Sequence, residues 1–308
     1  MKTAFIFPGQ GAHVNKVSVL QGYDRQLYAD EIEIISEAYG MDILDFALHA
    51  DAATLSQVQY TQLIVFATSI CFLAIAKKNG VRPDLVAGHS IGQFAAMYAA
   101  GCFDLAAEAG LVRQRATLMG EITTEGKLCA IKAPFPMDMA YITGLCDEIS
   151  KQTGKILGPA LINSDKQIVV GGEPEALKEI SEQLRRGGRG YSSVILPVGQ
   201  AFHTELMRPM LKPFEACLNR ISVKEPSIPL VLNTTGAFYH GEDLRNELLA
   251  HCVRPVQWLN TMQTISEEKP IIYEVGLGHT LSGFFRNYAK THVVPMEDPK
   301  LFFKAIRP

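Results

Sequence analysis

The sequence lacks several features that mark other classes of protein. Its 308 residues contain only six cysteines, and no two of them are spaced as CxxC. The cysteines and the eight histidines are scattered without the spacing of metal ligands, so we expect no metal site. The net charge is only −3, which excludes a chain-wide attraction to nucleic acid or to an anionic membrane. Internal repeats, low-complexity tracts and linker-like stretches are also absent, which excludes fibrous and disordered proteins.

Long apolar runs are scarce as well. The most apolar run, 63–76, is shorter than the roughly 20 residues of a membrane span and contains Thr68 and Ser69. We therefore expect a buried helix there and no membrane partner. The first residues, MKTAFIFPGQ, form a strand pattern and not the apolar core of a signal peptide. Together with the few cysteines, this pattern leads us to expect the protein in the reducing cytoplasm.

The apolar residues that are present form short runs that alternate with longer amphipathic segments. With 47% hydrophobic and 20% charged residues, the composition is typical of a globular enzyme with one large core. The pattern predicts strands at 4–7 and 85–88, and helices at 17–39, 53–78, 91–100 and 105–119. Strands that alternate with helices predict an α/β fold, with a parallel sheet covered on both faces.

Near residue 127 the order of the predicted elements changes. It becomes strand, helix, strand, strand, helix, strand, at 128–133, 137–152, 158–163, 167–171, 174–186 and 192–198. This βαββαβ order predicts a ferredoxin-like subdomain, which we place at residues 125–195. Residues 1–124 and 196–308 then form a large α/β-hydrolase-like catalytic domain, with a helix at 205–219 and strands at 230–233 and 271–275. We expect a cleft between the two domains.

The segment Gly88-His89-Ser90-Ile91-Gly92 follows a predicted strand and precedes a predicted helix. Strand, GxSxG and helix in this order are typical of a nucleophile elbow, in which a tight turn presents the serine to the substrate. The N-terminus of the helix adds partial positive charge where an oxyanion develops. A turn of small residues that only packs the helix on the sheet is the alternative. We interpret Ser90 as a nucleophile.

A serine hydroxyl needs a base within reach to take its proton. His203 follows the last strand of the inserted subdomain and starts a helix, so we expect it to re-enter the large domain at the cleft. A helix-capping role is the alternative. His89 adjoins Ser90 but should point away from it on the turn, and His13 and His279 are weaker candidates. The remaining histidines stand in polar contexts, where we expect exposure to solvent: His49, His240, His251 and His292.

Several motifs occur along nearly the whole chain in the order of a known family. They are Phe7-Pro8-Gly9-Gln10-Gly11, Thr61-Gln62, GHSIGQ around Ser90, Leu111-Val112-Arg113-Gln114-Arg115, Ala201-Phe202-His203, Pro255-Val256-Gln257-Trp258, and Glu274-Val275-Gly276 with Gly278. The chain resembles malonyl-CoA:acyl carrier protein transacylases. The resemblance implies an acyltransferase that moves a malonyl group from coenzyme A to the phosphopantetheine thiol of an acyl carrier protein, in fatty-acid or polyketide biosynthesis.

The resemblance also implies the catalytic residues. Ser90 would be the nucleophile and His203 the general base. The backbone carbonyl of Gln257 would orient the histidine, since no Asp or Glu is placed to do so. The backbone amides of Gln10 and Ile91 would form the oxyanion hole. No cofactor is implied, because the substrate is itself an acyl-CoA and the carrier brings its own phosphopantetheine.

A second group of residues would bind the substrate. Arg115 follows Ser90 by 25 positions, which is the family's spacing for the arginine that holds the malonyl carboxylate. Its planar guanidinium can offer two parallel donors to a carboxylate, whereas a lysine is a point charge. Gln62 would line the acyl site, and Asn163 matches an asparagine near the pantetheine channel. Phe202 would leave little room for a branch on the α-carbon of the acyl group, with a core role as its alternative.

The chain departs from the family pattern at residues 11–16, which lack the usual Gly-Met-Gly, at Gln200 and at Leu277. These departures favour a specialised member. Two specialised roles fit these departures: a stand-alone acyltransferase that serves a polyketide assembly line, and the transacylase that primes malonate decarboxylase. The shape of the loop that supplies one oxyanion amide is the feature most affected.

Two other functions would use the same residues. A proofreading thioesterase would strip stalled acyl groups from carrier proteins with Ser90 and His203. The charge of Arg115 argues against it, because a neutral acyl group would leave this charge unpaired. A non-catalytic docking module would need none of the three residues. We therefore expect a transferase.

An acidic carrier protein needs a basic surface on its enzyme. The densest basic cluster is Arg185, Arg186 and Arg189, with Lys178 earlier on the same predicted helix. We expect the end of this helix to overhang the cleft and to dock the carrier protein. A helix end whose cations offset the helix dipole is the alternative. We expect a monomer whose partners are acyl-CoA and the acyl carrier protein.

Overall fold

The larger of two sheets is parallel and has β1 at its centre. The computed structural model describes residues 2–11, 14–289 and 291–306. Five parallel strands lie in the order β7-β2-β1-β8-β9. They are β1 (Thr3–Phe7), β2 (Leu85–Gly88), β7 (Leu230–Val231), β8 (Ile271–Glu274) and β9 (Val293–Pro295). The predicted parallel sheet is therefore confirmed.

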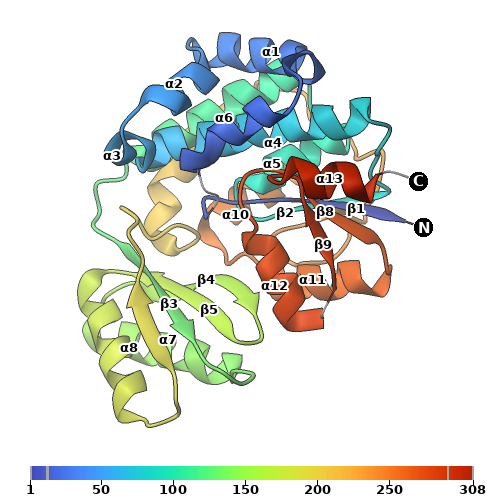
Figure 1. The fold of residues 1–308 in the computed structure, drawn as a ribbon. Helices are drawn as coiled ribbons and strands as arrows, with labels where there is room; N and C mark the ends of the chain where they lie inside the picture. Colours follow the sequence, from blue (N-terminus) through green and yellow to red (C-terminus); the bar gives the residue numbers. More distant parts are fainter. Residues whose placement is uncertain (1, 12–13, 290, 307–308) are drawn as a thin grey trace.

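Helices cover both faces of this sheet because its strands are apolar on both sides. In β1, Phe5 and Phe7 belong to one core, whereas Ala4 and Ile6 belong to another, as the alternation of side chains along a strand requires. Figure 1 shows α1, α4, α6 and α13 on one side of the sheet, and α11 and α12 on the other. These helices, with α5 after β2, are α1 (Ala29–Tyr39), α4 (Val58–Lys78), α5 (Gly92–Ala99), α6 (Leu105–Gly120), α11 (Trp258–Glu267), α12 (Thr280–Ala289) and α13 (Pro299–Ala305).

Helix α4 contains the apolar run 63–76 and is longer than that run, with 21 residues. In the part of the chain that the structure describes, it is the one helix long and apolar enough to cross a membrane. However, 83% of its most apolar window is buried inside the protein. It is apolar all round because it packs on its neighbours from every side. The expected buried helix is thus confirmed.

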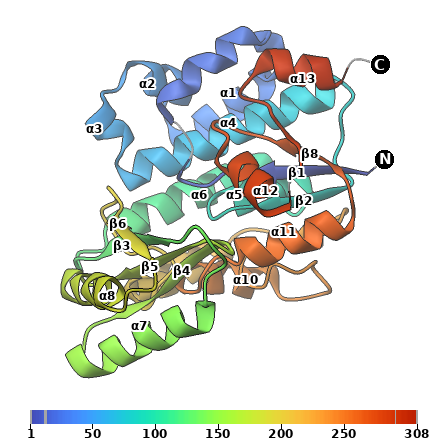
Figure 2. The ribbon, with the colours of Figure 1, turned by 60° about the horizontal axis from the view of Figure 1, so that its bottom comes forward.

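The smaller sheet is antiparallel and has the order β4-β5-β3-β6. Its elements follow the predicted βαββαβ sequence: β3 (Lys127–Lys132), α7 (Met139–Thr153), β4 (Leu157–Ser164), β5 (Gln167–Gly172), α8 (Pro174–Arg186) and β6 (Ser192–Ile195). This order and connectivity are those of a ferredoxin-like fold. Figure 2 shows α7 and α8 together on one face of this sheet. The other face adds Leu128, Ala130 and Val169 to the core of the large domain.

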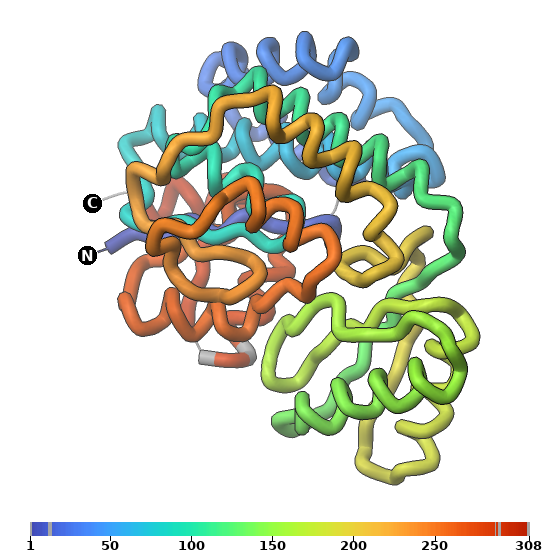
Figure 3. The backbone as a smooth tube through the Cα atoms, turned by 180° about the vertical axis from the view of Figure 1, so that it is seen from behind, coloured from blue at the N-terminus to red at the C-terminus, as the bar shows by residue number. Residues whose placement is uncertain are grey.

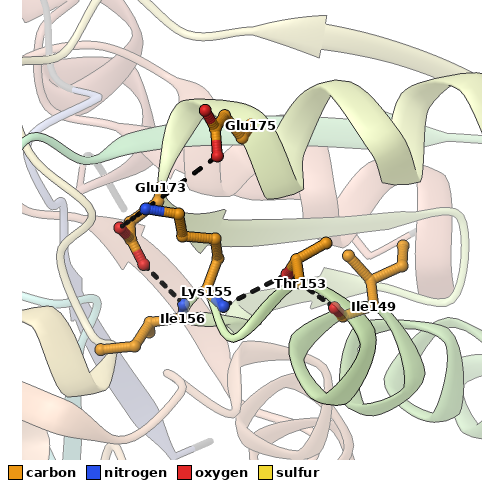
Figure 4. Close-up of polar contacts among 6 residues, drawn as sticks. All are labelled: Ile149, Thr153, Lys155, Ile156, Glu173 and Glu175. Carbon is orange, nitrogen blue, oxygen red and sulfur yellow. Dashed lines mark hydrogen bonds and ion pairs between the residues drawn. The ribbon is translucent and has the colours of Figure 1, made fainter.

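The turn that leads from α7 into β4 is held by the residue that precedes α8. Glu173 accepts a hydrogen bond from the backbone amide of Ile156 at 2.8 Å, and Lys155 lies 3.2 Å from the same carboxylate (Figure 4). The backbone amide of Lys155 also donates to the Thr153 hydroxyl, which in turn donates to the carbonyl of Ile149. These contacts lie within the subdomain and fix the end of the small sheet at which β3 begins, since Leu157 and Lys127 both pair with Gly172.

The inserted subdomain joins the large domain through two adjacent connections. A Cβ on Gly126 would lie 3.0 Å from Cβ of Ala201, and the side chain of Gln200 donates to the carbonyl of Ile122 at 3.4 Å. Figure 3 shows the subdomain as a separate lobe at one corner of the molecule. The chain thus enters and leaves the lobe at one place, directly before His203. The proposed limits of the subdomain, 125 and 195, remain a prediction.

Several predicted elements are shorter than the sequence pattern indicated. The segment 17–39 contains two 3-10 helices (Val14–Gly22 and Arg25–Leu27) before α1. The predicted helix 205–219 is divided into a 3-10 helix (Glu205–Met210) and α9 (Leu211–Leu218), because Pro209 cannot donate a helical hydrogen bond. Six further helices of the described chain were not predicted as separate elements: α2 (Ile43–His49), α3 (Ala52–Leu55), α10 (Leu244–Val253), α11, α12 and α13.

Candidate active site

Ser90 lies on a tight turn between β2 and α5. Its backbone is in the left-handed region, with a φ of 54°, as the serine of a nucleophile elbow requires. The turn needs small neighbours, because a Cβ on Gly88 would collide with the backbone of Gly92. A Cβ on Gly92 would in turn collide with the carbonyl oxygen of Phe7. The loop after β1 therefore packs directly on the turn that carries Ser90.

His203 contacts Ser90, although 113 positions separate the two residues in the sequence. Its Nε2 lies 2.7 Å from Oγ of Ser90, and its Nδ1 lies 2.7 Å from the carbonyl oxygen of His251. A carbonyl oxygen only accepts hydrogen bonds, so Nδ1 carries the ring proton and Nε2 is free to accept from the serine hydroxyl. The side chain is only 2% exposed. The pair has the geometry of a serine and its general base.

The environment of His203 keeps its ring neutral. Burial lowers the pKa of His203 to about 3, and the positive charge of Arg115 adds to this effect. A neutral imidazole is the form that can accept a proton from a hydroxyl. The low pKa thus preserves the basic form over the whole ordinary pH range.

The carbonyl that orients His203 is not the predicted one. The expectation for Gln257 is wrong, because its carbonyl accepts hydrogen bonds from N and Oγ1 of Thr261, at 3.0 and 3.1 Å. Gln257 is the residue before α11, so its carbonyl begins the hydrogen bonds of that helix. His251 instead lies in the last turn of α10, where carbonyls have no partner within the helix. This position leaves its carbonyl free for His203.

Two backbone amides beside Ser90 are available for an oxyanion. Within the described residues, the amides of Gln10 and Ile91 donate no hydrogen bond. A Cβ on Gly9 would lie 2.7 Å from the carbonyl oxygen of His89, so Gln10 follows a segment that touches the turn. Ile91 precedes α5, whose N-terminus provides partial positive charge. The oxyanion hole that the resemblance implies from these two amides remains a prediction.

Asn233 holds the turn in place and was missed by the sequence analysis. Its Oδ1 accepts a hydrogen bond from the amide of Ser90 at 2.9 Å. Its Nδ2 donates to Oε1 of Gln93 at 2.6 Å and to the carbonyl of Gly88. Asn233 follows β7, which lies beside β2 in the sheet. The available signal was its position at the end of a predicted strand, because the carboxyl ends of parallel strands share one edge.

Arg115 on α6 is 1% exposed and has no carboxylate partner among the described residues. One amino group of its guanidinium, NH1, donates to Oε1 of Gln62 on α4, and Nε2 of Gln62 donates to Sδ of Met119 at 3.2 Å. The guanidinium carbon lies 5.5 Å from the ring centroid of Phe94. Nε and NH2 of Arg115 are buried and have no geometric hydrogen-bond partner in the described part of the chain, although the thiol of Cys252 lies beside the guanidinium. These two atoms form the edge of a guanidinium that binds a carboxylate side-on.

Residues 4–276 match the family described as "Acyl transferase domain". The chain belongs to this family. It is 30% identical over 92% of its length to the polyketide biosynthesis protein ThaF of Burkholderia thailandensis, of which it spans only 24%. It is 28% identical over 94% of its length to the malonyl CoA-acyl carrier protein transacylase of Escherichia coli K12, of which it spans 93%.

Solved structures show the same similarity for this acyltransferase. The malonyl CoA-acyl carrier protein transacylase of Coxiella burnetii superposes with a TM-score of 0.91, at 26% identity over 99% of this chain and 97% of the other. A complex described as a type II polyketide synthase acyl carrier protein with its malonyl-transacylase also matches, with a TM-score of 0.91 at 25% identity over 99% of both chains. The recognised family and the two-sheet fold are therefore confirmed.

In the acyltransferase, Asn163 of β4 contacts the turn from the side of the subdomain. Its Oδ1 lies 2.9 Å from Nε2 of His89, and this contact is buried. Burial lowers the pKa of His89, and its ring packs edge-on against Trp258 with centroids 5.4 Å apart. His89 thus points away from Ser90, as expected. The suggested place of Asn163 near the pantetheine channel remains a prediction.

The other predicted residues are placed as follows. Phe202 is buried and belongs to the large core, so the core role that the sequence analysis gave as its alternative is observed. Its contact with the acyl group remains a prediction. His251 is 1% exposed, so its expected exposure to solvent is wrong. His13 lies outside the described residues. The exposed histidines are His49, His240, His279 and His292.

The basic cluster of the acyltransferase lies at the outer end of the subdomain. Ser192, which starts β6, pairs with Lys132 at the far end of β3. The preceding Arg185, Arg186 and Arg189 are therefore remote from the connections to the large domain, and their place over the cleft remains a prediction. Arg186 forms an ion pair with Glu182 at 2.9 Å, and Arg189 lies over the ring of Tyr141 at 3.9 Å. Whether this cluster docks a carrier protein remains a prediction.

Proposed function

We propose that the protein transfers a malonyl group from coenzyme A to the phosphopantetheine thiol of an acyl carrier protein. The observation that carries the proposal is the free edge of Arg115, buried near a serine and histidine that are in hydrogen-bond contact. A buried cation without an internal anion is costly unless a ligand supplies the charge. The carboxylate of a malonyl group is such a ligand.

The first half of the reaction places the acyl group on the serine. Nε2 of His203 takes the proton of Ser90 as Oγ attacks the thioester carbonyl. The carbonyl oxygen becomes an oxyanion, which accepts hydrogen bonds from the amides of Gln10 and Ile91. When the carbon–sulfur bond breaks, the proton on His203 passes to the leaving thiolate of coenzyme A. The carbonyl of His251 stabilises the transient imidazolium through Nδ1.

The second half repeats these steps in the opposite direction. The phosphopantetheine thiol gives its proton to His203 and attacks the malonyl ester of Ser90. The new thioester forms as the bond to Oγ breaks, and the serine regains its proton from the imidazolium. The protein ends in its starting state, so the reaction needs no cofactor or external oxidant.

Arg115 separates the transferase from a hydrolase that clears varied acyl groups. A neutral acyl chain would leave the guanidinium unpaired, whereas the carboxylate of a malonyl group would pair with it and hold the thioester carbon at Ser90. Gln62 holds NH1 of Arg115 and so turns the edge formed by Nε and NH2 toward the substrate. Phe202 would restrict branching at the α-carbon.

The acyl carrier protein is the proposed acceptor. The complex of a malonyl-transacylase with its acyl carrier protein, to which this chain is similar, supports this partner. We place the reaction in polyketide or fatty-acid biosynthesis, in the cytoplasm, and expect a monomeric enzyme.

Trapping of the acyl-enzyme tests the proposal. The protein is incubated with malonyl-CoA or acetyl-CoA, and its intact mass is measured before and after addition of a holo acyl carrier protein. We expect one malonyl group on the wild type, none on Ser90→Ala, and loss of the label when the carrier is added. Equal labelling of Ser90→Ala, or release only as free malonate, would contradict the proposal.

A further inference from the structure

The ring of His251 is a buried polar group that the proposed reaction does not use. Its backbone carbonyl orients His203, but its side chain is a separate feature. The side chain is 1% exposed, and neither Nδ1 nor Nε2 has a hydrogen-bond partner among the described residues. A buried polar atom without a partner costs free energy, and such atoms are rare in native proteins. This ring therefore needs an explanation.

The ring lies between the catalytic pair and the arginine. Its centroid is 5.0 Å from that of His203 and 6.5 Å from that of Phe94. The guanidinium of Arg115 lies over the same Phe94 ring, at 5.5 Å. The residues thus form a continuous series of contacts from Ser90 through His203, His251 and Phe94 to Arg115.

Unpartnered donors gather in this one region. Nε and NH2 of Arg115 and both ring nitrogens of His251 are buried without hydrogen-bond partners in the described chain. Burial, followed by the charges around it, lowers the pKa of His251, so its ring is neutral and carries one N–H. A carboxylate accepts about four hydrogen bonds, of which the free edge of Arg115 supplies two. A further donor is needed to satisfy it.

We propose that the side chain of His251 donates a hydrogen bond to the carboxylate of the acyl group and so contributes to acyl selectivity together with Arg115. This inference rests on the proposed function. The arginine would supply charge and two parallel donors, and the imidazole would supply a third, neutral donor from the side of the catalytic histidine. A carboxylate held from two directions is fixed relative to the thioester carbon that Ser90 attacks.

Two substitutions separate this role from packing. His251→Phe keeps the ring and the backbone carbonyl that holds His203, but removes both nitrogens. His251→Gln keeps a flexible N–H donor. We expect His251→Phe to lower kcat/KM for self-acylation by malonyl-CoA about tenfold to a hundredfold, which is the usual effect of losing a hydrogen bond to a charged group. Acetyl-CoA has no carboxylate, so its loss should be about tenfold smaller than the loss for malonyl-CoA, and His251→Gln should recover much of the malonyl activity.

Binding provides a readout that does not depend on turnover. In the Ser90→Ala background, His251→Phe should weaken the binding of malonyl-CoA in calorimetry by a larger factor than the binding of acetyl-CoA. Equal losses for both acyl groups would show that His251 only positions His203 and would overturn the inference. Unchanged malonyl activity would overturn it as well. Failure of the proposed function is distinguishable, because Arg115→Ala would then leave the preference for malonyl intact in a protein with an unaltered His251.

Discussion

Ser90 and His203 are joined by a 2.7 Å contact, and both have a left-handed backbone, with φ of 54° and 61°. Residues other than glycine rarely adopt this backbone conformation, and each residue that does so costs about 1 to 2 kcal/mol of folding free energy. Only one other described residue that is not glycine, Lys269, has a positive φ. The strain is therefore concentrated at the two residues that exchange the proton.

This strain predicts an unusual order of stabilities. Ser90→Gly should be about 1 kcal/mol more stable than Ser90→Ala, since glycine adopts a positive φ freely. Both variants lack the nucleophile, so denaturant unfolding compares them directly. The matched control is Ser69 in the middle of α4, where Ser69→Gly should be less stable than Ser69→Ala by about 1 kcal/mol. The same order at both positions would contradict the strain at Ser90.

The low pKa of His203 predicts how acylation depends on pH. An ordinary histidine is protonated as the pH falls below about 6.5 and then cannot act as a base. Because the pKa of His203 is lowered to about 3, its neutral form persists below that range. Single-turnover acylation of Ser90 should therefore keep a nearly constant rate from about pH 8 to pH 5. A fall in rate with a midpoint near 6.5 would show that His203 has an ordinary pKa.

The same pKa has a consequence for stability. The unfolded chain binds a proton at this histidine below about pH 6.5, whereas the folded protein does not until about pH 3. The contribution of neutral His203 to the free energy of unfolding is therefore complete above pH 6.5, and it is lost as the pH falls towards 3. His203→Gln should lessen this loss between about pH 6 and pH 4 in denaturant unfolding. An unchanged pH dependence would mean that other groups account for the acid sensitivity.

Arg115 should decide between acidic and neutral acyl groups. Arg115→Ala should lower malonyl transfer by about 30-fold to 1,000-fold, because a charge-assisted contact with two hydrogen bonds is worth about 2 to 4 kcal/mol. Acetyl transfer should be less impaired or improve. Arg115→Lys should lie between the two, since it keeps the charge and loses the planar edge. Equal losses for malonyl and acetyl groups would give Arg115 a structural role.

Charge reversal tests the docking prediction for Arg185, Arg186 and Arg189. The triple change to glutamate should raise KM for the carrier protein and reduce its dependence on salt, because screened attraction is what such a cluster supplies. Self-acylation from malonyl-CoA should stay unchanged and serves as the internal control. Since Arg186 already pairs with Glu182, reversal of Arg185 alone should produce a disproportionate share of the effect. Unaltered transfer in the triple variant would place the docking surface elsewhere.

The sequence predicted those parts of the site that depend on local patterns. The GxSxG motif between a predicted strand and a predicted helix identified Ser90. His203 was placed at the cleft because the chain returns to the large domain there, after the six elements of the subdomain. Gln257 was assigned wrongly because every residue has a carbonyl, so residue type carries no signal for a contact made by the backbone. His251 was expected at the surface, since polar neighbours in sequence do not reveal that α10 packs against the catalytic histidine. Asn233 was missed for a similar reason, because its contacts depend on the neighbouring strand.

The adjacent connections of the subdomain make it exchangeable. The segments around Gly126 and Ala201 lie side by side. The residues between them could therefore be replaced without a change in how the chain connects the elements of the large domain. Such a replacement must preserve the contact between Asn163 and His89, the backbone hydrogen bonds between β4 and Val256, and the side chains that the lobe adds to the large core. Chimeras that graft the lobe of another family member onto this sheet would therefore retain the acylation chemistry. They would exchange the outer surface of the lobe, where the basic cluster lies, and would leave the turn of Ser90 in its own domain.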